Sequence, residues 1–236
     1  MVDSFLGDNP RGIMNKQLEN NSPHPPLSAR STGLAALVEN ARHALSLTCM
    51  ESTHALVAAV EAKDPHTRAH SHTVAQYAVG IGKKLQLPPA ELASLRTAAL
   101  LHDIGKIGIP DAILTKPGPL TAAERLIVQR HPEAALEIIR GVSFLSAERP
   151  LILHHHERYD GTGYPARLKG DEIPLGARII AIADALDAML STRSYKPAYD
   201  LPRVRAEITS GSGHQFDPLV ARAAFALLND LESLPD

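Results

Sequence analysis

The sequence predicts an all-α fold, a helical bundle with an extra helix on its N-terminal side. Three observations predict it. Apolar residues recur every three or four positions in several segments, which is the period of an amphipathic helix. Proline follows Asp or His at three segment starts, where its fixed φ favours the first helical turn. No segment alternates apolar and polar residues as a half-buried strand would.

The composition narrows the class of protein. The 236 residues are 44% hydrophobic and 21% charged, as in a globular domain with a short extension. A formal net charge of -2 provides no overall positive field, so we expect no nucleic-acid polymer as partner. No apolar run approaches the roughly 18 residues that span a bilayer, so we expect no membrane contact. A single cysteine, Cys49, and a start without an apolar signal region favour the cytoplasm.

The first sixty residues divide into two segments. We expect residues 1–30 to be a flexible tail or linker, because the Asn-, Ser- and Pro-rich run 20–26 has no apolar period. Residues 31–62 are expected to form a helical extension. That helix either pairs two copies of the chain, with parallel pairing as one arrangement, or packs as the first helix of the domain. Its apolar positions are Leu34, Leu37, Val38, Ala41 and Leu45.

The next two helices are predicted from an N-cap residue and from apolar positions along one helix face. Asp64-Pro65 predicts an N-cap and first turn. On this helix one face carries His66, His70, Val74, Tyr77 and Ile81. A further helix starts near Pro89 and carries a stripe of Leu92, Leu95, Ala99 and His102, before Gly105, Gly108 and Pro110 end it.

Three later helices complete the prediction. His131-Pro132 places His131 at a helix entrance, with Ala135, Ile138 and Ile139 as the apolar face. The segment from Leu175 to Leu190 is apolar nearly all round, which predicts a buried helix. Asp217-Pro218 caps a last amphipathic helix that runs toward Leu228.

Polar residues stand on faces that should be apolar. His102 and Asp103 end the stripe of one helix, and Asp184 and Asp187 lie on the buried one. A buried carboxylate costs several kcal/mol unless a cation or dense hydrogen bonding compensates it. Imidazoles and carboxylates without a thiolate suit iron or manganese better than structural zinc. The set spread over several helices is His70, His102, Asp103, His131, His155, His156 and Asp184.

At these positions the chain resembles the HD-GYP family, the cyclic di-GMP phosphodiesterase branch of the HD superfamily. His102-Asp103 is an HD pair, and the run from His155 to Pro165 is similar to the family's extended motif. Segments around Asp64-Pro65, Lys116-Pro117-Gly118, Ala183-Asp184 and Phe216-Asp217-Pro218 resemble its flanking motifs. The resemblance covers residues 51–230, which is the expected catalytic domain.

The resemblance implies an HD fold that holds divalent metals, with iron or manganese favoured. The seven residues match its ligand positions, and Asp103 would bridge two metals. A metal-activated water would attack phosphorus in line, with Asp103 and Lys106 as the catalytic residues. The implied product is pGpG, followed by GMP if a second step occurs. Positions matching the family's contacts to cyclic di-GMP are Lys106, Asp187, Arg193 and Lys196.

Three features leave alternatives open. His66 stands where some members carry a Glu that helps hold a third metal, so we expect two metals, with His66 a third-metal ligand or a support behind one. His154 makes a run of three, so the ligand register could shift by one. The loop of Asp160, Gly161, Gly163, Tyr164 and Pro165 is a substrate-side loop, a surface for signalling partners, or a demanding turn.

Other functions compete with this interpretation. The chain could be a sensor or partner-binding module without turnover, a phosphodiesterase for another cyclic dinucleotide, or a different HD hydrolase. Intact ligand positions favour the enzyme. The remaining histidines match no ligand position and are expected at the surface: His24, His43, His54, His72 and His214.

Overall fold

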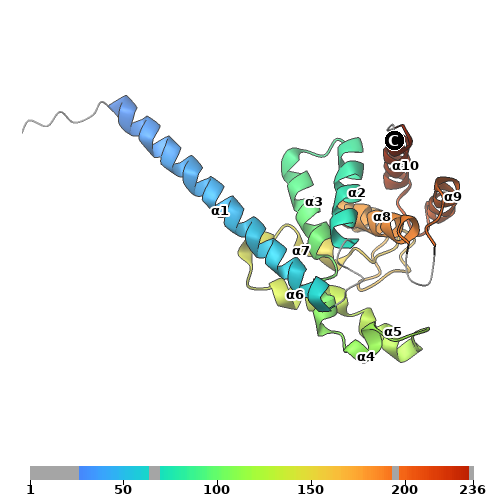
Figure 1. The fold of residues 1–236 in the computed structure, drawn as a ribbon. Coiled ribbons are helices and arrows are strands. Elements are labelled where there is room, and N and C mark those ends of the chain that lie inside the picture. Colours follow the sequence, from blue (N-terminus) through green and yellow to red (C-terminus); the bar gives the residue numbers. More distant parts are fainter. Residues whose placement is uncertain (1–26, 64–69, 193–196, 234–236) are drawn as a thin grey trace, which may run out of the picture. The chain divides into compact units, whose positions relative to one another are not determined.

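A computed structural model describes residues 27–63, 70–192 and 197–233 (Figure 1). Within these ranges the chain is built of helices and turns without a β-strand, and an isolated bridge pairs Ser212 with Phe216. The all-α prediction is therefore confirmed. No helix in the described ranges is both long and apolar enough to cross a membrane.

The N-terminal helix α1 spans Leu27–Lys63. It begins four residues before the predicted boundary at residue 31, inside the segment that composition assigned to a tail. The run from Leu27 to Arg30 contains no proline or glycine, so nothing in it opposes a helix that follows Pro26. Residues 46–236 form one compact unit, and the part of α1 before Ser46 belongs to another. The predicted tail up to residue 26 lies outside the described residues.

Four helices form the core of the larger unit. They are α2 (His70–Lys84), α3 (Pro89–Leu101), α8 (Leu175–Leu190) and α10 (Pro218–Glu232), and α2 packs against the other three. Fully buried aliphatic side chains such as Ile81, Leu95 and Ile180 fill the space between them. The bounds of α8 match the predicted buried helix. The predicted start at Asp64-Pro65 lies outside the described residues.

The chain leaves α3 through a tight turn that carries the HD pair. α3 ends at Leu101, His102 is its C-cap, and a 3₁₀ helix, η2, follows over Ile104–Gly108. Gly105 was predicted to end a helix, but its main role here is close packing. A Cβ on Gly105 would lie 1.8 Å from the His131 carbonyl oxygen. The two short helices α4 (Asp111–Leu114) and α5 (Ala122–Val128) come next.

Helices α6 (His131–Ile139) and α7 (Arg149–Leu153) lie side by side, joined by a 3₁₀ turn, η3 (Ser143–Leu145). Arg149 donates hydrogen bonds to three carbonyls at the end of α6, the shortest at 2.7 Å to Arg140. This caps the carboxyl end of α6 and fixes α7 to it. Ile138 was predicted on the apolar face, but it is 39% exposed, because Ala135, Leu136 and Ile139 are the residues of this short helix that pack toward the core.

The last part of the chain ties α8 to α10. After the 3₁₀ helix η4 (Gly170–Glu172) and α8, helix α9 spans Leu201–Gly211. Asp217 caps α10 by accepting a hydrogen bond from the Leu219 amide, as predicted. The second carboxylate oxygen of Asp217 accepts a 2.7 Å bond from Arg178 of α8. Because Asp217 is buried, this ion pair compensates a charge and joins the two helices.

Candidate metal centre

The seven predicted ligand side chains converge inside the larger unit. Two groups each bring one ligand atom per residue to within 4.8 Å of one another. The first contains Asp103, His131, His155 and His156, and the second contains His70, His102 and Asp184. The side chains come from α2, the α3–η2 turn, α6, the end of α7 and α8. Chain segments more than 100 residues apart in sequence therefore meet at one place.

Three of the imidazoles are held by carbonyls of their own turns. Nδ1 of His102, His131 and His155 lies 2.7 Å from the carbonyl oxygen three residues earlier, on Ala99, Val128 and Ile152. A carbonyl oxygen can only accept, so each Nδ1 carries the proton and donates it. Each Nε2 then presents a lone pair to the centre. The sequence produces this arrangement locally, because each histidine stands at the end or start of a helix.

The imidazole of His70 is held by a distant carboxylate. Its Nδ1 donates to Asp187 Oδ2 at 2.6 Å, and Ser191 Oγ donates to Asp187 Oδ1 at 3.0 Å. Asp187 is only 3% exposed. A carboxylate that fixes the outer nitrogen of a metal-binding imidazole is a recurrent arrangement in metal sites. The resemblance implied that Asp187 contacts substrate, and that role stays a prediction.

Asp103 lies between the two groups. Its Oδ1 is 3.4 Å from His131 Nε2, while its Oδ2 is 3.4 Å from His102 Nε2 and 3.8 Å from His70 Nε2. Lys106, one turn later in η2, approaches the same Oδ2 to 2.6 Å. The Lys106 side chain is 23% exposed, whereas that of Asp103 is 5% exposed. Lys106 thus lies at the solvent-facing edge of the cluster, together with Asp184, whose side chain is 29% exposed.

Burial keeps most of these imidazoles neutral. Burial lowers the pKa of His131, and it lowers that of His155 further, where the neighbouring His156 adds to the effect. Burial together with His131 lowers the pKa of His156 to about 4. For His70, burial alone would lower the pKa, but the bond to Asp187 and the charge of Asp184 raise it. Although burial opposes ionisation of Asp103, Lys106 and His102 hold its pKa well below the usual value.

The donor set fits divalent metal ions. His131 Nε2 and His155 Nε2 are 3.4 Å apart, yet both present lone pairs and cannot bond to each other. His102 Nε2 is buried and has no hydrogen-bond partner among the described residues. Converging lone pairs of this kind cost free energy unless a cation sits between them. Neutral imidazoles and an ionised carboxylate are the protonation states that a metal needs.

Several predicted residues stand apart from the cluster. His154 is outside both groups, and its Nδ1 lies 3.5 Å from Glu157 Oε1, whereas His155 and His156 belong to the first group. His43, His54, His72 and His214 are exposed, as expected. His24, His66, Arg193 and Lys196 lie outside the described residues, so the third-metal and two of the substrate assignments stay predictions.

A family model supplies the deciding comparison. Residues 54–220 match the family described as HD domain, which is more than half of the chain. The chain belongs to the HD domain family. Together with the relatives described next, its DGTGYP segment makes it an HD domain of the HD-GYP type.

Relatives of this HD domain are named as phosphodiesterases of cyclic dinucleotides. It is 40% identical over 187 residues to a cyclic di-GMP phosphodiesterase of Vibrio cholerae, covering 73% of this chain and 38% of that one. It is 41% identical over 170 residues to the cyclic di-GMP phosphodiesterase response regulator RpfG of Xanthomonas campestris, covering 71% and 45%. A 3′3′-cGAMP-specific phosphodiesterase 2 of Vibrio cholerae is 40% identical, with 72% and 33% covered. The chain thus spans less than half the length of these relatives.

Solved structures support the fold. The Bdellovibrio bacteriovorus protein Bd1817 matches with a TM-score of 0.56 and 18% identity, covering 68% of this chain and 51% of that chain. The HD domain of the phosphodiesterase PgpH from Listeria monocytogenes, solved with cyclic-di-AMP, matches with a TM-score of 0.55 and 20% identity, covering 78% and 99%. At such identities the likeness concerns the fold alone.

The loop of residues 160–165, called the GYP loop below, packs directly on His155 and His156, the candidate ligand pair. The two glycines act differently: Gly161 has a φ of +82°, as the sequence suggested, but Gly163 does not have a positive φ. Gly163 is needed for space, because a Cβ there would lie 2.3 Å from the Arg158 nitrogen. Close backbone packing, and not a positive φ, therefore explains the glycine at position 163. The Tyr164–Pro165 peptide bond is cis.

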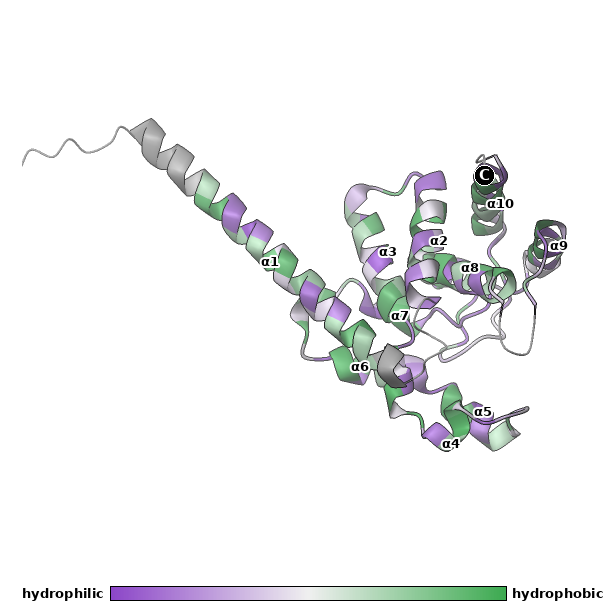
Figure 2. Ribbon diagram, viewed as in Figure 1, coloured by the Kyte–Doolittle hydropathy of each residue, from purple (hydrophilic) through white to green (hydrophobic). Residues whose placement is uncertain are grey.

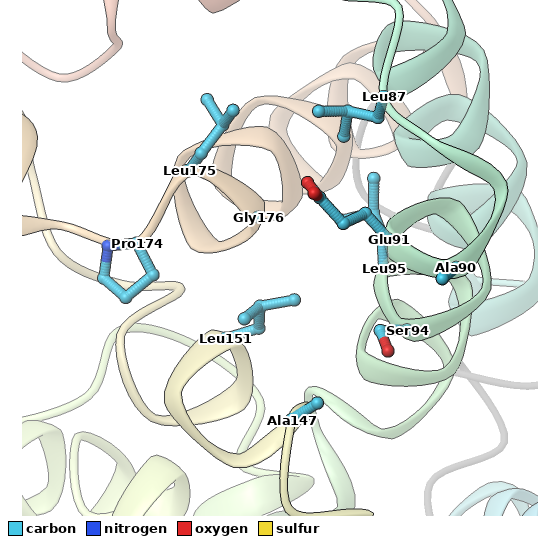
Figure 3. Close-up of a pocket in the computed structure, with 10 residues that line it drawn as sticks. All are labelled: Leu87, Ala90, Glu91, Ser94, Leu95, Ala147, Leu151, Pro174, Leu175 and Gly176. Atoms are coloured by element: carbon cyan, nitrogen blue, oxygen red, sulfur yellow. The ribbon is translucent and has the colours of Figure 1, made fainter.

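An apolar hollow of about 350 Å³ lies away from the metal ligands, between α3, α7 and the start of α8 (Figure 3). The side chain of Leu151 projects into it. Glu91 is the one charged residue in its lining, and none of the seven ligands contributes. This hollow therefore lacks the groups that hydrolysis of a phosphodiester requires.

Two residues that matter for the site were missed from the sequence. Gly105 allows η2 to touch α6, and Glu157 accepts a 2.7 Å hydrogen bond from the Ala166 amide behind the GYP loop. Gly105 stands directly after the HD pair, and Glu157 directly after the ligand pair. Their adjacency to ligands was a signal, but the contacts they make are visible only in three dimensions.

Proposed function

We propose that this HD domain is a metal-dependent phosphodiesterase that hydrolyses cyclic di-GMP to pGpG, and to GMP if a second step follows. The observation that carries the proposal is the convergence of seven candidate ligand side chains, among which Asp103 faces both groups. Similarity at about 40% identity to relatives named for this activity supports the choice of substrate.

The residues divide the work. His131, His155, His156 and Asp103 would hold one metal, and His70, His102 and Asp184 the other, with Asp103 shared between them. Two metals of this kind would polarise a phosphodiester. They would also lower the pKa of a bound water, which supplies a nucleophile at neutral pH. Fe or Mn suits the imidazole and carboxylate donors. Lys106 at the solvent-facing edge would contact the phosphate and stabilise the charge that develops in the transition state.

The decisive experiment is hydrolysis of cyclic di-GMP by protein purified without chelator or oxygen and loaded with Fe(II) or Mn(II). Products would be separated by chromatography. We expect turnover in the wild type and a loss of at least about a thousandfold in Asp103→Ala. His72→Ala is the matched control, because His72 is an exposed histidine two residues from His70. Tight binding of the dinucleotide without turnover with either metal would instead identify a sensor.

A second substrate has support of its own. Two relatives with 40% and 41% identity are named 3′3′-cGAMP-specific phosphodiesterases. The mixed ring differs from cyclic di-GMP in one base, whose contacts would include the predicted Arg193. A substrate panel with equal concentrations of the two rings and of cyclic di-AMP measures the preference. Arg binds the O6/N7 edge of guanine, so we expect cyclic di-GMP to be hydrolysed fastest.

A homodimer through α1 is the next part of the proposal. Hydrophobic residues recur at several turns of α1 between hydrophilic ones (Figure 2). Leu37 and Leu45 are 67% and 66% exposed. A second copy of the helix in parallel would cover such a stripe as a coiled coil. Sedimentation should give a dimer for the wild type and a monomer for Leu37→Glu combined with Leu45→Glu, while Glu39→Ala serves as a surface control.

Signalling partners are proposed to dock on the outer part of the GYP loop. Thr162 is exposed, whereas Tyr164 turns its ring toward His156. We expect Thr162→Arg to reduce capture of a partner in a pull-down more than Tyr164→Phe does.

A further inference from the structure

The ring of His156 is held differently from those of the other ligands. Among the described residues no side chain or carbonyl hydrogen-bonds it, whereas four other imidazoles each have a partner at Nδ1. Instead, the ring of Tyr164 stacks on it, with a centroid distance of 4.9 Å and an interplanar angle of 28°. His131 packs against the same imidazole edge-on at 4.9 Å. The plane of His156 is therefore set by ring contacts.

The position of Tyr164 is in turn fixed by the backbone of the residue that it supports. The Tyr164 amide donates to the His156 carbonyl oxygen at 3.2 Å. The preceding Gly163 lies against the chain of residues 156–158, where a Cβ would come within 2.5 Å of the Glu157 Cα. The loop leaves the ligand pair, turns at Gly161 and returns onto it. A shift of this loop would carry Tyr164 off the His156 ring.

Glu157 closes the loop from behind. Its side chain is 0% exposed, and its Oε1 accepts the 2.7 Å hydrogen bond from the Ala166 amide. Its Oε2 has no hydrogen-bond partner among the described residues. A buried carboxylate with so few bonds costs folding free energy. A residue that is costly for stability and lies next to a ligand indicates a role in the site.

We infer that Tyr164 and Glu157 are positioning residues that together clamp His156. The GYP loop then serves the group of Asp103, His131, His155 and His156, and it fixes the coordination of the metal held there. Both residues act on the site through His156. The inference rests on the proposed metal centre, and it assigns to the loop a task that is separate from substrate binding or partner docking.

The test is calorimetric titration of chelator-treated protein with Mn(II) alone, which reports the number and affinity of sites without turnover. Tyr164→Leu fills the space but lacks a flat ring, whereas Tyr164→Phe keeps the ring. Glu157→Ala removes the acceptor for Ala166, whereas Glu157→Gln keeps one. Gly163→Ala lifts the loop by collision with residues 156–158. Gly141→Ala is the matched control, because a Cβ at Gly141 meets nothing within 4 Å.

We expect the Leu and Ala replacements at 164 and 157, and Gly163→Ala, to weaken one of the two metal sites by about 10- to 100-fold. The other site should keep its affinity, and Tyr164→Phe, Glu157→Gln and Gly141→Ala should match the wild type. Thermal unfolding of the metal-free variants checks that each of them still folds. Among the three disruptive variants, Tyr164→Leu changes the packed volume least. Wild-type affinities at both sites in Tyr164→Leu would overturn the clamp and leave the phosphodiesterase proposal standing. A wild type that binds no Mn(II) would overturn both.

Discussion

The imidazoles of the candidate metal centre are held in two different ways. His102, His131 and His155 each donate Nδ1 to a carbonyl three residues earlier in their own turn. His70 and His156 depend on side chains from elsewhere in the chain, on Asp187 at a distance of 117 residues and on Tyr164 in the following loop. The first set is built from backbone, and the second from tertiary contacts.

The difference determines which mutations can act. No side-chain substitution removes a carbonyl, so the first set responds only when the backbone itself moves. The second set responds to the change of one side chain. Orientation of a ligand by its outer partners commonly contributes 10- to 100-fold in metal affinity. We therefore expect the two sets to separate cleanly in mutational experiments.

The largest effect should come from Gly105→Ala, which attacks the backbone-held set. The new methyl group would overlap the His131 carbonyl oxygen and lie 2.6 Å from the Ala135 nitrogen. Backbone cannot rotate away as a side chain can, so η2 and α6 must separate. We expect a loss of at least about 3 kcal/mol in unfolding free energy, together with loss of metal binding. Chemical denaturation measures the first and Mn(II) titration the second. Gly108→Ala is the control, because a Cβ there would make an ordinary van der Waals contact with the Ala134 Cβ at 4.0 Å; equal stability of the two variants would contradict this account.

Asp187→Ala should have the next largest effect, and it addresses the side-chain-held set. His70 would lose the acceptor at 2.6 Å and rotate more freely. We expect Mn(II) affinity at the site with His70, His102 and Asp184 to fall about 10- to 100-fold. Asp187→Asn retains an acceptor oxygen and should recover most of the affinity. An unchanged Mn(II) affinity in Asp187→Ala, together with a higher KM for cyclic di-GMP, would instead favour the substrate role that the resemblance implied.

Much of the fold could be predicted from the sequence. The bounds of α8 and the cap at Asp217 follow from local patterns, because a buried stripe and an N-cap are written in consecutive residues. Helices α5 and α9 were missed, although their signals were present. Thr121 and Glu124 form a capping box, and Asp200 caps α9 before Leu201-Pro202. Helix α7 has five residues, which is too short for a periodic pattern.

The ligand set was predicted by motif resemblance, and the supports behind the ligands were not. The pairing of His70 with Asp187 joins α2 to α8, and no spacing rule links positions so far apart. The stacking of Tyr164 on His156 depends on a loop that returns on itself. The contact of Gly105 with His131 depends on how η2 meets α6. These are tertiary facts, whereas the i−3 carbonyl bonds are local ones.

A smaller effect is expected from pH in the metal-free protein. The folded pKa values of His131, His155 and His156 lie below the unfolded value near 6.5, that of His156 at about 4. Below pH 6.5 the unfolded chain therefore binds protons that the folded chain refuses, so stability falls as pH drops from about 6.5 to about 4. His70 acts in the opposite direction, because its raised folded pKa gives stability that is lost as pH rises.

Thermal unfolding of chelator-treated protein between pH 7.5 and 4.5 measures this dependence. Because three histidines have a lowered folded pKa and one has a raised folded pKa, we expect the Tm to fall as the pH is lowered. His156→Gln removes one of the titrating groups and should flatten the slope. A Tm that stays level toward acid would show that these imidazoles titrate as exposed groups, and a Tm that rises would show that the raised pKa of His70 outweighs the three lowered ones.

The smallest effect should come from Ser191→Ala, which removes a hydrogen bond to Asp187, the residue that orients His70. Ser191 donates a 3.0 Å hydrogen bond to Asp187 Oδ1, at the last turn of α8. The position of Asp187 is set mainly by the helix backbone, because the Ser191 amide also bonds to the Asp187 carbonyl oxygen and this bond survives the mutation. Loss of one hydroxyl bond costs about 1 kcal/mol, so metal affinity should fall by less than about fivefold. Ser146→Ala, on an exposed turn, gives the baseline. If Ser191→Ala weakened Mn(II) binding as much as Asp187→Ala, the hydroxyl, and not the helix, would be what aims the carboxylate at His70.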